Sequence, residues 1–220
     1  MERLVIAGAS GHARVVADAA RATERFELIG HLDRVAGSAD PRLTAPVIGS
    51  ETDLPGLIVQ HRIDAVVVAI GDNHLRWRVA RRIREICPEL PFAVVIHPRA
   101  CLSPDVIPGE GTVIMAGAIV NCGSRIGRHC ILNTQCSLDH DGRLDDASSL
   151  APGSILGGNC QVGEFTAISL GARLIHGIHI GSHTVIGAGA TVLDSIPAGV
   201  VAYGTPARVI RARAEGEPYL

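Results

Sequence analysis

The chain has 220 residues, a formal net charge of −2 and 47% hydrophobic residues, which is enough for one large folded domain or two small ones. Aromatic residues make up only 3% while glycine occurs 25 times, so we expect a regular stack of aliphatic and small side chains rather than an aromatic-rich core. The 20 basic residues, all of them arginine, form no basic block and no apolar run approaches transmembrane length, so we expect a cytoplasmic protein that binds neither nucleic acid nor membrane.

Residues 1–97 alternate short apolar segments with amphipathic ones, which predicts a small parallel α/β domain of Rossmann-like type. Strands are expected at residues 4–7, 27–32, 65–70 and 92–96. The segment at 65–70 is continuously apolar, as strands inside a parallel sheet are. The residues expected on the buried faces of two helices are Val15, Val16, Ala19 and Ala20 for the first and Leu75, Val79, Ile83 and Cys87 for the second.

Polar and glycine-containing segments follow three of these strands. Gly8-Ala9-Ser10-Gly11-His12 allows a phosphate to approach backbone N–H groups at a helix start, or is a plain tight turn, and it lacks the full dinucleotide-binding fingerprint. Asp33 is a candidate to bind a ribose or sugar, or to cap a turn. Gly71-Asp72-Asn73 lies where open α/β sheets bind ligands, and it is equally an N-cap for the next helix.

Residues 98–220 form a second predicted domain, dominated by a six-residue repeat. Every sixth residue from Ile114 to Val192 is Leu, Ile or Val, and 13 of the 14 residues that lie two positions earlier are small. The aliphatic positions are Ile114, Val120, Ile126, Leu132, Leu138, Leu144, Leu150, Leu156, Val162, Ile168, Leu174, Ile180, Ile186 and Val192. The spacing excludes an α-helix and predicts an all-β triangular coil in which each hexad is one short strand and a corner.

Small residues and glycines accompany the repeat. The side chains two positions before the aliphatics are expected to turn inward near the corners, where space is tight. Glycines directly after an aliphatic are expected at the corners, where a positive φ is useful. These glycines are Gly127, Gly157, Gly163, Gly181 and Gly187. None of the six cysteines forms a Cys-x-x-Cys pair, so we expect reduced thiols, several of them buried, and no metal.

Three stretches together resemble a known family. They are Gly8-Ala9-Ser10-Gly11-His12-Ala13-Arg14, the segment from Asn133-Thr134 to Asp139-His140-Asp141, and Gly204-Thr205-Pro206-Ala207-Arg208. With the order of the two domains, they resemble the hexapeptide-repeat nucleotide-sugar acetyltransferases of the sialic acid O-acetyltransferase-like family, including N-acetyltransferases of UDP-4-amino sugars and of GDP-perosamine. The resemblance implies a left-handed β-helix, acetyl-CoA as cosubstrate in a groove between subunits of a homotrimer, and an N-terminal domain that binds a nucleotide-linked amino sugar.

The resemblance also implies residue roles. His140 would be the general base and Asp141 its carboxylate partner. In the N-terminal domain the turn containing Gly8, Ser10, Gly11 and His12 would lie near sugar and pyrophosphate, and Asp33, Gly71 and Asn73 near the nucleoside. On the β-helix, Gly158 would face the thioester carbonyl and Arg208 would meet CoA phosphates, although Arg208 is equally interpreted as a solvated charge near the terminus.

The sequence departs from the family at one position. Many relatives carry a second histidine nine residues after the first, near the acetyl group, and here that residue is Ser149. Ser149 donates a hydrogen bond to the oxyanion itself, or a backbone N–H does all of this work. From the residues alone, His140 stands out among ten histidines because Asp139 and Asp141 flank it, and the alternative is a polar corner without chemistry.

The leading hypothesis is N-acetylation of the 4-amino group of a nucleotide-linked amino-deoxy sugar by direct attack on the thioester, with His140 taking the proton. One alternative is O-acetylation of a sugar of sialic acid type. Another is a non-catalytic trimeric scaffold that binds sugar. A carbonic anhydrase of the γ class shares the repeat, but it needs a three-histidine zinc set, and the ten histidines show no convincing spacing for one.

Overall fold

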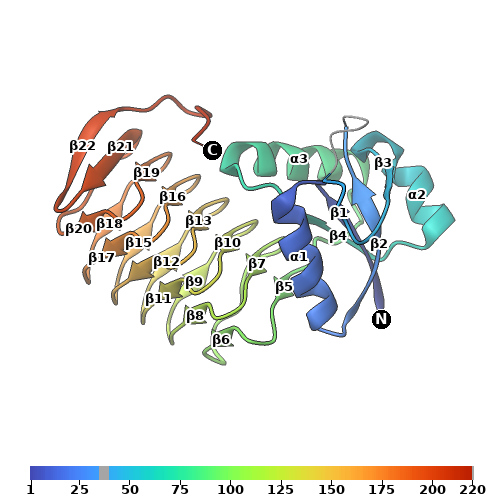
Figure 1. Cartoon of the computed structure of the whole chain (residues 1–220), viewed down its shortest axis with the longest axis horizontal. Helices are drawn as coiled ribbons and strands as arrows, with labels where there is room; N and C mark the ends of the chain where they lie inside the picture. The colour runs from blue at the N-terminus through green and yellow to red at the C-terminus, as the bar shows by residue number, and fades with distance from the viewer. Residues whose placement is uncertain (35–39, 220) are drawn as a thin grey trace. The chain divides into compact units, whose positions relative to one another are not determined.

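The computed structural model describes residues 1–34 and 40–219, and the chain divides into two compact units, Met1–Pro98 and Arg99–Leu220. The predicted combination of an α/β domain followed by a left-handed parallel β-helix is confirmed (Figure 1). None of the helices in the described ranges combines the length and the hydropathy needed to span a bilayer.

The first unit is built on a parallel sheet with the strand order β3-β2-β1-β4. Two predicted strands match β1 and β2 closely, whereas Phe92 in the fourth makes only an isolated bridge to Val66. The elements are β1 (Glu2–Ala7), α1 (Gly11–Ala22), β2 (Phe26–Leu32), β3 (Val47–Gly49), the 3₁₀ turn η1 (Glu51–Asp53), α2 (Leu54–His61), β4 (Ala65–Val68), α3 (Asn73–Ile86) and β5 (Val95–Ile96).

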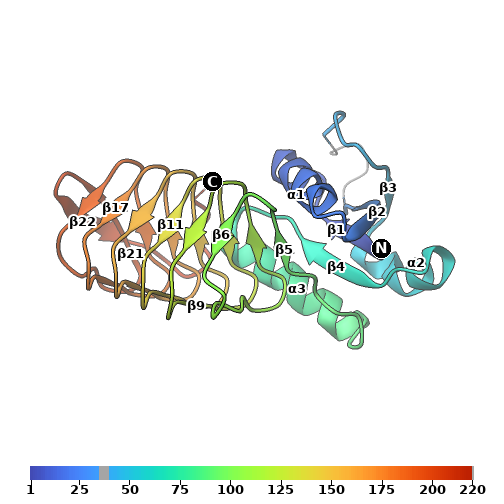
Figure 2. The same ribbon diagram turned by 90° about the horizontal axis from the view of Figure 1, so that it is seen from below.

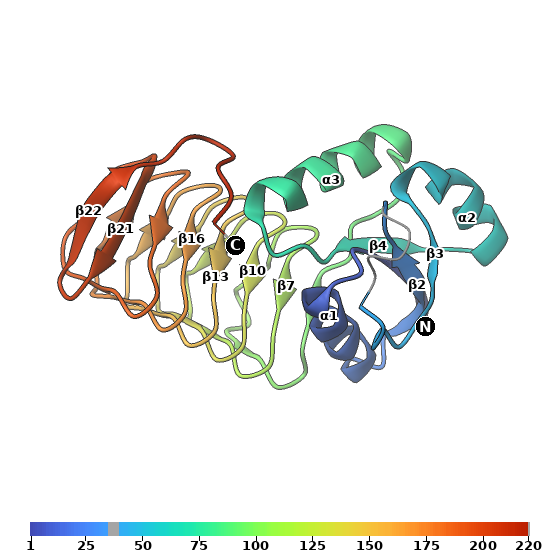
Figure 3. The same cartoon turned by 45° about the horizontal axis from the view of Figure 1, so that its top comes forward.

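Helices α1 and α3 lie on opposite faces of this sheet (Figures 2 and 3). The strands are apolar on both faces because both are covered: Val5 and Ala7 pack in one cluster with residues of α2 and α3. Two sequence predictions about the helices are wrong. Val15 is 44% exposed and Leu75 is 39% exposed, because each lies just outside the buried stripe of its helix.

The second unit is a triangular β-helix with one short strand on each side of every coil (Figure 1). Strands stack in parallel on the residues 18 positions further along, as when Leu132 pairs with Leu150 and Leu150 with Ile168. The first side carries β7 (Val113–Ile114), β10 (Ile131–Leu132), β13 (Ser149–Leu150), β16 (Ala167–Ile168) and β19 (Val185–Ile186). The second carries β6 (Cys101–Leu102), β8 (Ile119–Val120), β11 (Ser137–Leu138), β14 (Ile155–Leu156), β17 (Arg173–Leu174) and β20 (Thr191–Val192). The third carries β9 (Arg125–Ile126), β12 (Arg143–Leu144), β15 (Gln161–Val162) and β18 (His179–Ile180).

A hairpin follows the last coil. Strand β21 (Val200–Gly204) continues the first side by pairing with β19, and β22 (Ala207–Ala212) runs antiparallel to β21. The six-residue repeat stops at Val192, so the sequence pattern gave no strand prediction for this segment.

The interior of the β-helix confirms the repeat. All 14 predicted aliphatic side chains are buried, none more than 5% exposed, and the residues two positions earlier are buried beside them. Each coil covers the aliphatic side chains of the one before, so the core is a continuous column. The column is uniform because every hexad supplies the same kind of side chain at the same place.

We expect Leu156→Ala to lower the free energy of unfolding by about 2–5 kcal/mol, the usual cost of truncating a buried leucine. Leu156 is 1% exposed, whereas its neighbour Ile155 in the same strand points outward and is 46% exposed. Ile155→Ala is therefore the matched control, with an expected change of about 0.5 kcal/mol or less. Urea unfolding of both variants measures the difference, and equal losses would contradict the inward orientation of Leu156.

The expectation of positive φ at the five glycines that follow an aliphatic residue is wrong. Positive φ occurs one position before each small residue, for example at Gly123 (φ 72°) and Asp141 (φ 56°). The five glycines serve a different need, because the next coil approaches them closely. A Cβ at Gly163 would lie 2.6 Å from the Ser182 nitrogen, and one at Gly157 would lie 2.8 Å from the His176 nitrogen. Stacked backbones leave no room for a side chain there.

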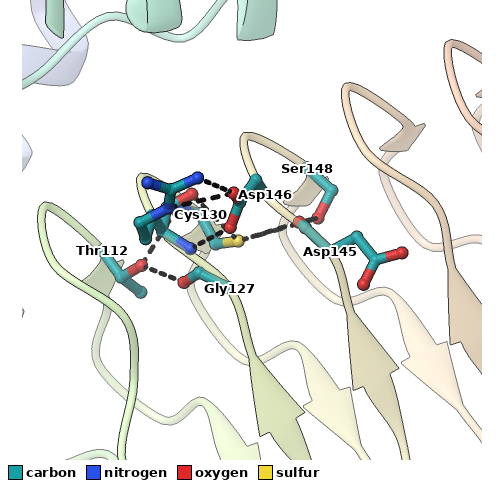
Figure 4. A network of polar contacts seen from close by, with 7 residues as sticks. Thr112, Gly127, Cys130, Asp145, Asp146 and Ser148 are labelled. Atoms are coloured by element: carbon teal, nitrogen blue, oxygen red, sulfur yellow. Dashed lines mark hydrogen bonds and ion pairs between the residues drawn. The ribbon is translucent and has the colours of Figure 1, made fainter.

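Small polar side chains near one corner bind the backbone of neighbouring coils (Figure 4). The Thr112 hydroxyl donates to the Gly127 carbonyl at 2.9 Å and accepts from the Cys130 N–H at 3.1 Å. Cys130 Sγ and Ser148 Oγ both donate to the Asp145 carbonyl, at 3.2 and 2.5 Å. These bonds explain why Ser, Thr and Cys recur here: each is small enough for the corner and satisfies a buried carbonyl.

Candidate functional site

The carboxyl edge of the sheet in the first unit gathers three of the predicted ligand segments. Ala7 is paired with Leu32 on one side and Val68 on the other, so the residues after β1, β2 and β4 emerge side by side. Gly8 adopts φ 123°, and a Cβ there would lie 2.7 Å from the Ala69 carbonyl oxygen. Only glycine fits this first position of the turn. Asp33 emerges at the same edge, where its N–H donates to the Gly49 carbonyl at 2.9 Å.

His31, a buried histidine that the sequence analysis missed, contacts the turn that begins at Gly8. His31 on β2 has no exposed surface, and its Nδ1 lies 2.9 Å from the Gly8 carbonyl oxygen. Because that oxygen only accepts, Nδ1 carries the proton and donates. Burial is the main cause that lowers the pKa of His31, so the ring is neutral and fixes the direction of the Gly8 carbonyl. A histidine inside an apolar strand gives no sequence signal for this contact.

Ser10, Gly11 and His12 form the start of α1. Ser10 is the exposed N-cap residue and its side chain makes no capping hydrogen bond, and the space beside the Gly11 α-carbon is open. The Nε2 atom of His12 is buried and has no hydrogen-bond partner among the described residues. Burial, with the nearby positive charge of Arg76, lowers the pKa of His12 to about 4, so this imidazole is neutral at pH 7.

The loop after β4 is organised by Arg76, a residue that the sequence analysis also missed. Arg76 and Asn73 have no exposed surface. The Arg76 guanidinium donates to the carbonyls of Ile70 and Gly71 at 3.0 and 3.1 Å and to Asn73 Oδ1 at 2.7 Å. Asp72 caps α3 by accepting from the Leu75 N–H at 2.8 Å. Asp72 is therefore the N-cap of α3, as one interpretation of the sequence has it. Gly71 and Asn73 accept hydrogen bonds from Arg76 instead.

The second group of predicted residues lies at the corner between β11 and β12 of the β-helix. His140 Nδ1 is 2.8 Å from Asp141 Oδ2, and the His140 N–H donates to Asp139 Oδ1 at 2.8 Å. Asn121, from the coil below, donates to the same Asp139 oxygen at 2.6 Å. The hydrogen bond that His140 donates to Asp141 is the largest cause that raises the pKa of His140 above its ordinary value, and the charge of Asp139 adds to it.

Gly158 lies against the His140 ring because it is one coil, or 18 residues, further along. A Cβ at Gly158 would lie 2.6 Å from Cε1 and 2.9 Å from Cδ2 of His140, and closer still to Nε2. The absent side chain is therefore what leaves room for the imidazole. With Nδ1 bonded to Asp141, Nε2 is the ring nitrogen on the Gly158 side. The coil period, applied to His140, would have found this contact from the sequence.

A surface cavity of about 610 Å³ opens beside this corner. Leu102, Val120 and Cys122 supply apolar wall, while Asn121, Asp139 and His140 supply polar groups. The corner can therefore combine a base held by a carboxylate with space for a bound molecule.

Ser149 and Arg208 lie elsewhere on the second unit. Ser149 is on β13, on a different side of the coil from the corner that carries His140, and it is 9% exposed. Within a single chain, Ser149 therefore does not lie beside the His140 imidazole. Arg208 is exposed on β22, where its guanidinium donates to the Ala207 carbonyl at 3.0 Å and lies 3.9 Å from Asp194. Across residues 1–34 and 40–219, no three His, Cys, Asp or Glu side chains gather as a metal site requires.

Comparison with known proteins gives a consistent result. Residues 3–83 match the model of the PglD N-terminal domain. The GDP-perosamine N-acetyltransferase of Escherichia coli O157:H7 is 28% identical over 150 residues, which is 66% of this chain and 66% of that protein, just under two thirds.

Solved structures match over nearly their whole length. PerB from Caulobacter crescentus, in complex with CoA and GDP-perosamine, is 38% identical with a TM-score of 0.87, covering 96% of this chain and 98% of that one. The acetyltransferase domain of PglB from Neisseria gonorrhoeae, in complex with acetyl coenzyme A, is 34% identical with a TM-score of 0.87, covering 95% and 99%.

Proposed function

We propose a function from one premise, which is that this chain belongs to the hexapeptide-repeat sugar N-acetyltransferases. It is 38% identical to PerB and covers 98% of that protein. We propose that it transfers the acetyl group of acetyl-CoA to the 4-amino group of a nucleotide-linked amino-deoxy sugar. The observation that carries the proposal is the His140 imidazole, held by Asp141 through Nδ1 and packed against Gly158 on its Nε2 side.

In the proposed reaction the amine nitrogen attacks the thioester carbonyl carbon directly. His140 Nε2 takes the proton that the amine loses as the C–N bond forms. The C–S bond then breaks, and the thiolate of CoA takes that proton from the imidazolium. Asp141 keeps the imidazole in the tautomer with its proton on Nδ1 and stabilises the cationic form. A thioester is already activated, so this chemistry requires no metal.

The other predicted residues support the proposal to different degrees. The segments containing Gly8, His12 and Gly71 meet at one sheet edge, which suits a nucleotide-linked sugar. We propose that Gly158 faces the thioester carbonyl because it lies beside Nε2. Ser149, on another side of the coil, reaches an acetyl group at His140 only if a neighbouring subunit supplies it.

We also propose a homotrimer. Several large apolar side chains of the β-helix are exposed in the single chain, including Ile119 at 44%, Ile155 at 46% and Leu170 at 58%, as expected for a surface that a second chain covers. Sedimentation equilibrium should give three times the 23.0 kDa of one chain. A mass of one chain at micromolar concentration would contradict the trimer without affecting the assignment of the base.

A panel of acceptors tests the reaction. UDP-, GDP- and dTDP-linked 4-amino sugars are each incubated with acetyl-CoA, and free thiol release is measured. We expect one nucleotide series to release thiol in equal amount to the N-acetyl product. The matching 4-hydroxy sugars are the control. If thiol were released with these alone, the assigned reaction would be O-acetylation instead of N-acetylation. Release with none of the acceptors would contradict the proposal.

The pH dependence of kcat/KM should report the His140–Asp141 pair. Because the pKa of His140 is raised and the base must be neutral, activity should rise as the pH increases through that raised pKa. We expect Asp141→Asn to move this acidic limb to lower pH, since it removes the largest cause of the raised pKa. Asn tolerates the positive φ of residue 141. The titration of the acceptor amine is common to both enzymes, so an unchanged profile would contradict the pairing.

A further inference from the structure

The cavity of about 610 Å³ beside His140 contains a second charged group, Asp139, which the proposed mechanism does not use. The apolar wall residues Leu102 and Val120 belong to the coils before His140, whereas Gly158 belongs to the coil after it. The proposed function places the thioester on the Gly158 side of the imidazole. The cavity on the other side is therefore the space in which an acceptor can reach the base.

Asp139 is held in place by hydrogen bonds from its backbone and its side chain. Its N–H donates to the Leu156 carbonyl at 3.1 Å, and its carbonyl accepts from the Ser124 hydroxyl at 2.8 Å. In the side chain, Oδ1 accepts from the His140 N–H at 2.8 Å and from Asn121 Nδ2 at 2.6 Å. The backbone and one carboxylate oxygen are thus fixed before any ligand binds, which lowers the entropic cost of recognition.

The second carboxylate oxygen of Asp139 is available to a ligand. Both side-chain hydrogen bonds go to Oδ1, and Oδ2 receives none from the residues that the structure describes. The hydrogen bond from Asn121 is the largest cause that keeps the pKa of Asp139 below its ordinary value, and the bond from the His140 N–H adds to it. The group is therefore ionised at pH 7, and an ionised carboxylate can only accept. Its complement on a bound molecule is a hydrogen-bond donor.

A 4-amino sugar carries such a donor next to its reacting nitrogen. In a pyranose, the carbon that bears the 4-amine is bonded to C3, which carries a hydroxyl group, and to C5, which carries the ring oxygen. Of these two neighbours only the hydroxyl group can donate. The protein places two acceptors side by side in the same cavity, His140 and Asp139. The pair of acceptors matches the pair of donors on the sugar.

We propose that Asp139 determines acceptor specificity by accepting a hydrogen bond, through Oδ2, from the 3-hydroxyl group of the sugar whose 4-amine reacts at His140. The acceptor class is then a 4-amino sugar with a free 3-hydroxyl group, rather than any primary amine of suitable size. Asn121 is a positioning residue, since it acts on the sugar through Oδ1 of Asp139. The inference rests on the proposed function, because it concerns the acceptor of that same reaction.

Two analogues of the accepted sugar test the proposal in the wild type. The 3-deoxy sugar has no group to donate, and the 3-deoxy-3-fluoro sugar has a group that cannot donate. Compared with a hydroxyl group, fluorine lowers the basicity of the neighbouring amine and hydrogen raises it, so a loss with both analogues does not come from the amine. We expect kcat/KM for each to be about tenfold or more below that for the 3-hydroxy sugar, the order expected for a lost hydrogen bond to a charged acceptor. A value within about twofold for either analogue would overturn the inference.

Asp139→Asn tests the residue itself. The amide can place an NH₂ group where Oδ2 stands, and this group donates to a hydroxyl group and to fluorine alike. The preference for the 3-hydroxy over the 3-fluoro sugar should therefore fall at least about fivefold, since the charged acceptor is gone. Weaker support of the His140 N–H would slow every acceptor by the same factor and leave this ratio unchanged. An unchanged ratio would reduce Asp139 to a structural residue and overturn the inference.

Asp145→Asn is the matched control. Asp145 follows β12 as Asp139 follows β11, but it pairs with Arg143 and does not line the cavity. We expect its ratio to stay within about twofold of the wild type, as for most surface substitutions, and an equal fall in this variant would also overturn the inference. Thiol release from the 3-hydroxy sugar is scored separately. A wild type that acetylates all three sugars equally defeats only the role of Asp139, whereas release with none of them defeats the proposed function.

Discussion

His140→Ala is expected to lower kcat by about 10²–10⁴-fold, the usual contribution of a general base. The imidazole lies on an exposed corner, and among the described residues its ring hydrogen-bonds to Asp141, so its removal should not disturb the coil. The affinity for acetyl-CoA should stay close to that of the wild type, because the loss is of proton transfer rather than of binding. Steady-state kinetics with the accepted amino sugar, together with a thermal melt, measures both effects.

His179→Ala is the control for this experiment. His179 is also an exposed histidine of the β-helix, on the outward position of β18, and its backbone N–H donates to Ser195. We expect its kcat to stay within about twofold of the wild type, as for most surface substitutions. A folded His140→Ala protein with a kcat near that of the wild type would remove His140 from the mechanism, whatever the control shows.

Gly158→Ala is expected to lower kcat by about 10²-fold while the protein still folds. The new methyl group would overlap the His140 ring, which is the end of a side chain and can swing away. Displacing a catalytic group by about 1 Å is enough for a loss of this size. Because the backbone need not move, the melting temperature should change little. Kinetics and a thermal melt on the same preparation separate the two effects.

The neighbouring Gly157 provides the matched comparison. A Cβ there would lie 2.8 Å from the His176 nitrogen and 3.1 Å from its α-carbon, which are backbone atoms that cannot swing away. Gly157→Ala should therefore lower the melting temperature and leave kcat of the folded protein nearly unchanged. If the two variants instead lost activity equally, the packing of the imidazole against Gly158 would not be what sets its position.

The interior of the β-helix could be predicted from the sequence because its physics is local and repeated. Each hexad places one aliphatic side chain inward, so a period of six residues identifies all 14 aliphatic positions of the central column without any tertiary contact. The corners were less predictable. Residues at positive φ include His129, Gln135 and Phe165 as well as glycines, so residue type does not mark the conformation. The stacking of coils overrides the preference of the single residue.

The candidate site was predictable where the chain order brings residues together. His140 and Asp141 are neighbours in sequence, and their hydrogen bond follows from that. Arg76 was missed because an arginine in an amphipathic helix is normally a surface residue, and its acceptors are loop carbonyls that only the fold supplies. His31 was missed because its partner, the Gly8 carbonyl, comes from the end of the neighbouring strand and only the fold brings the two together.

A crystal structure of the chain with CoA and the accepted amino sugar tests the central claim most directly. We predict that the 4-amino nitrogen lies about 2.6–3.2 Å from His140 Nε2, the range needed for proton transfer. We also predict that the sulfur of CoA lies on the Gly158 side of the ring. An amine bound out of reach of this imidazole, with another side chain placed to take its proton, would contradict the account.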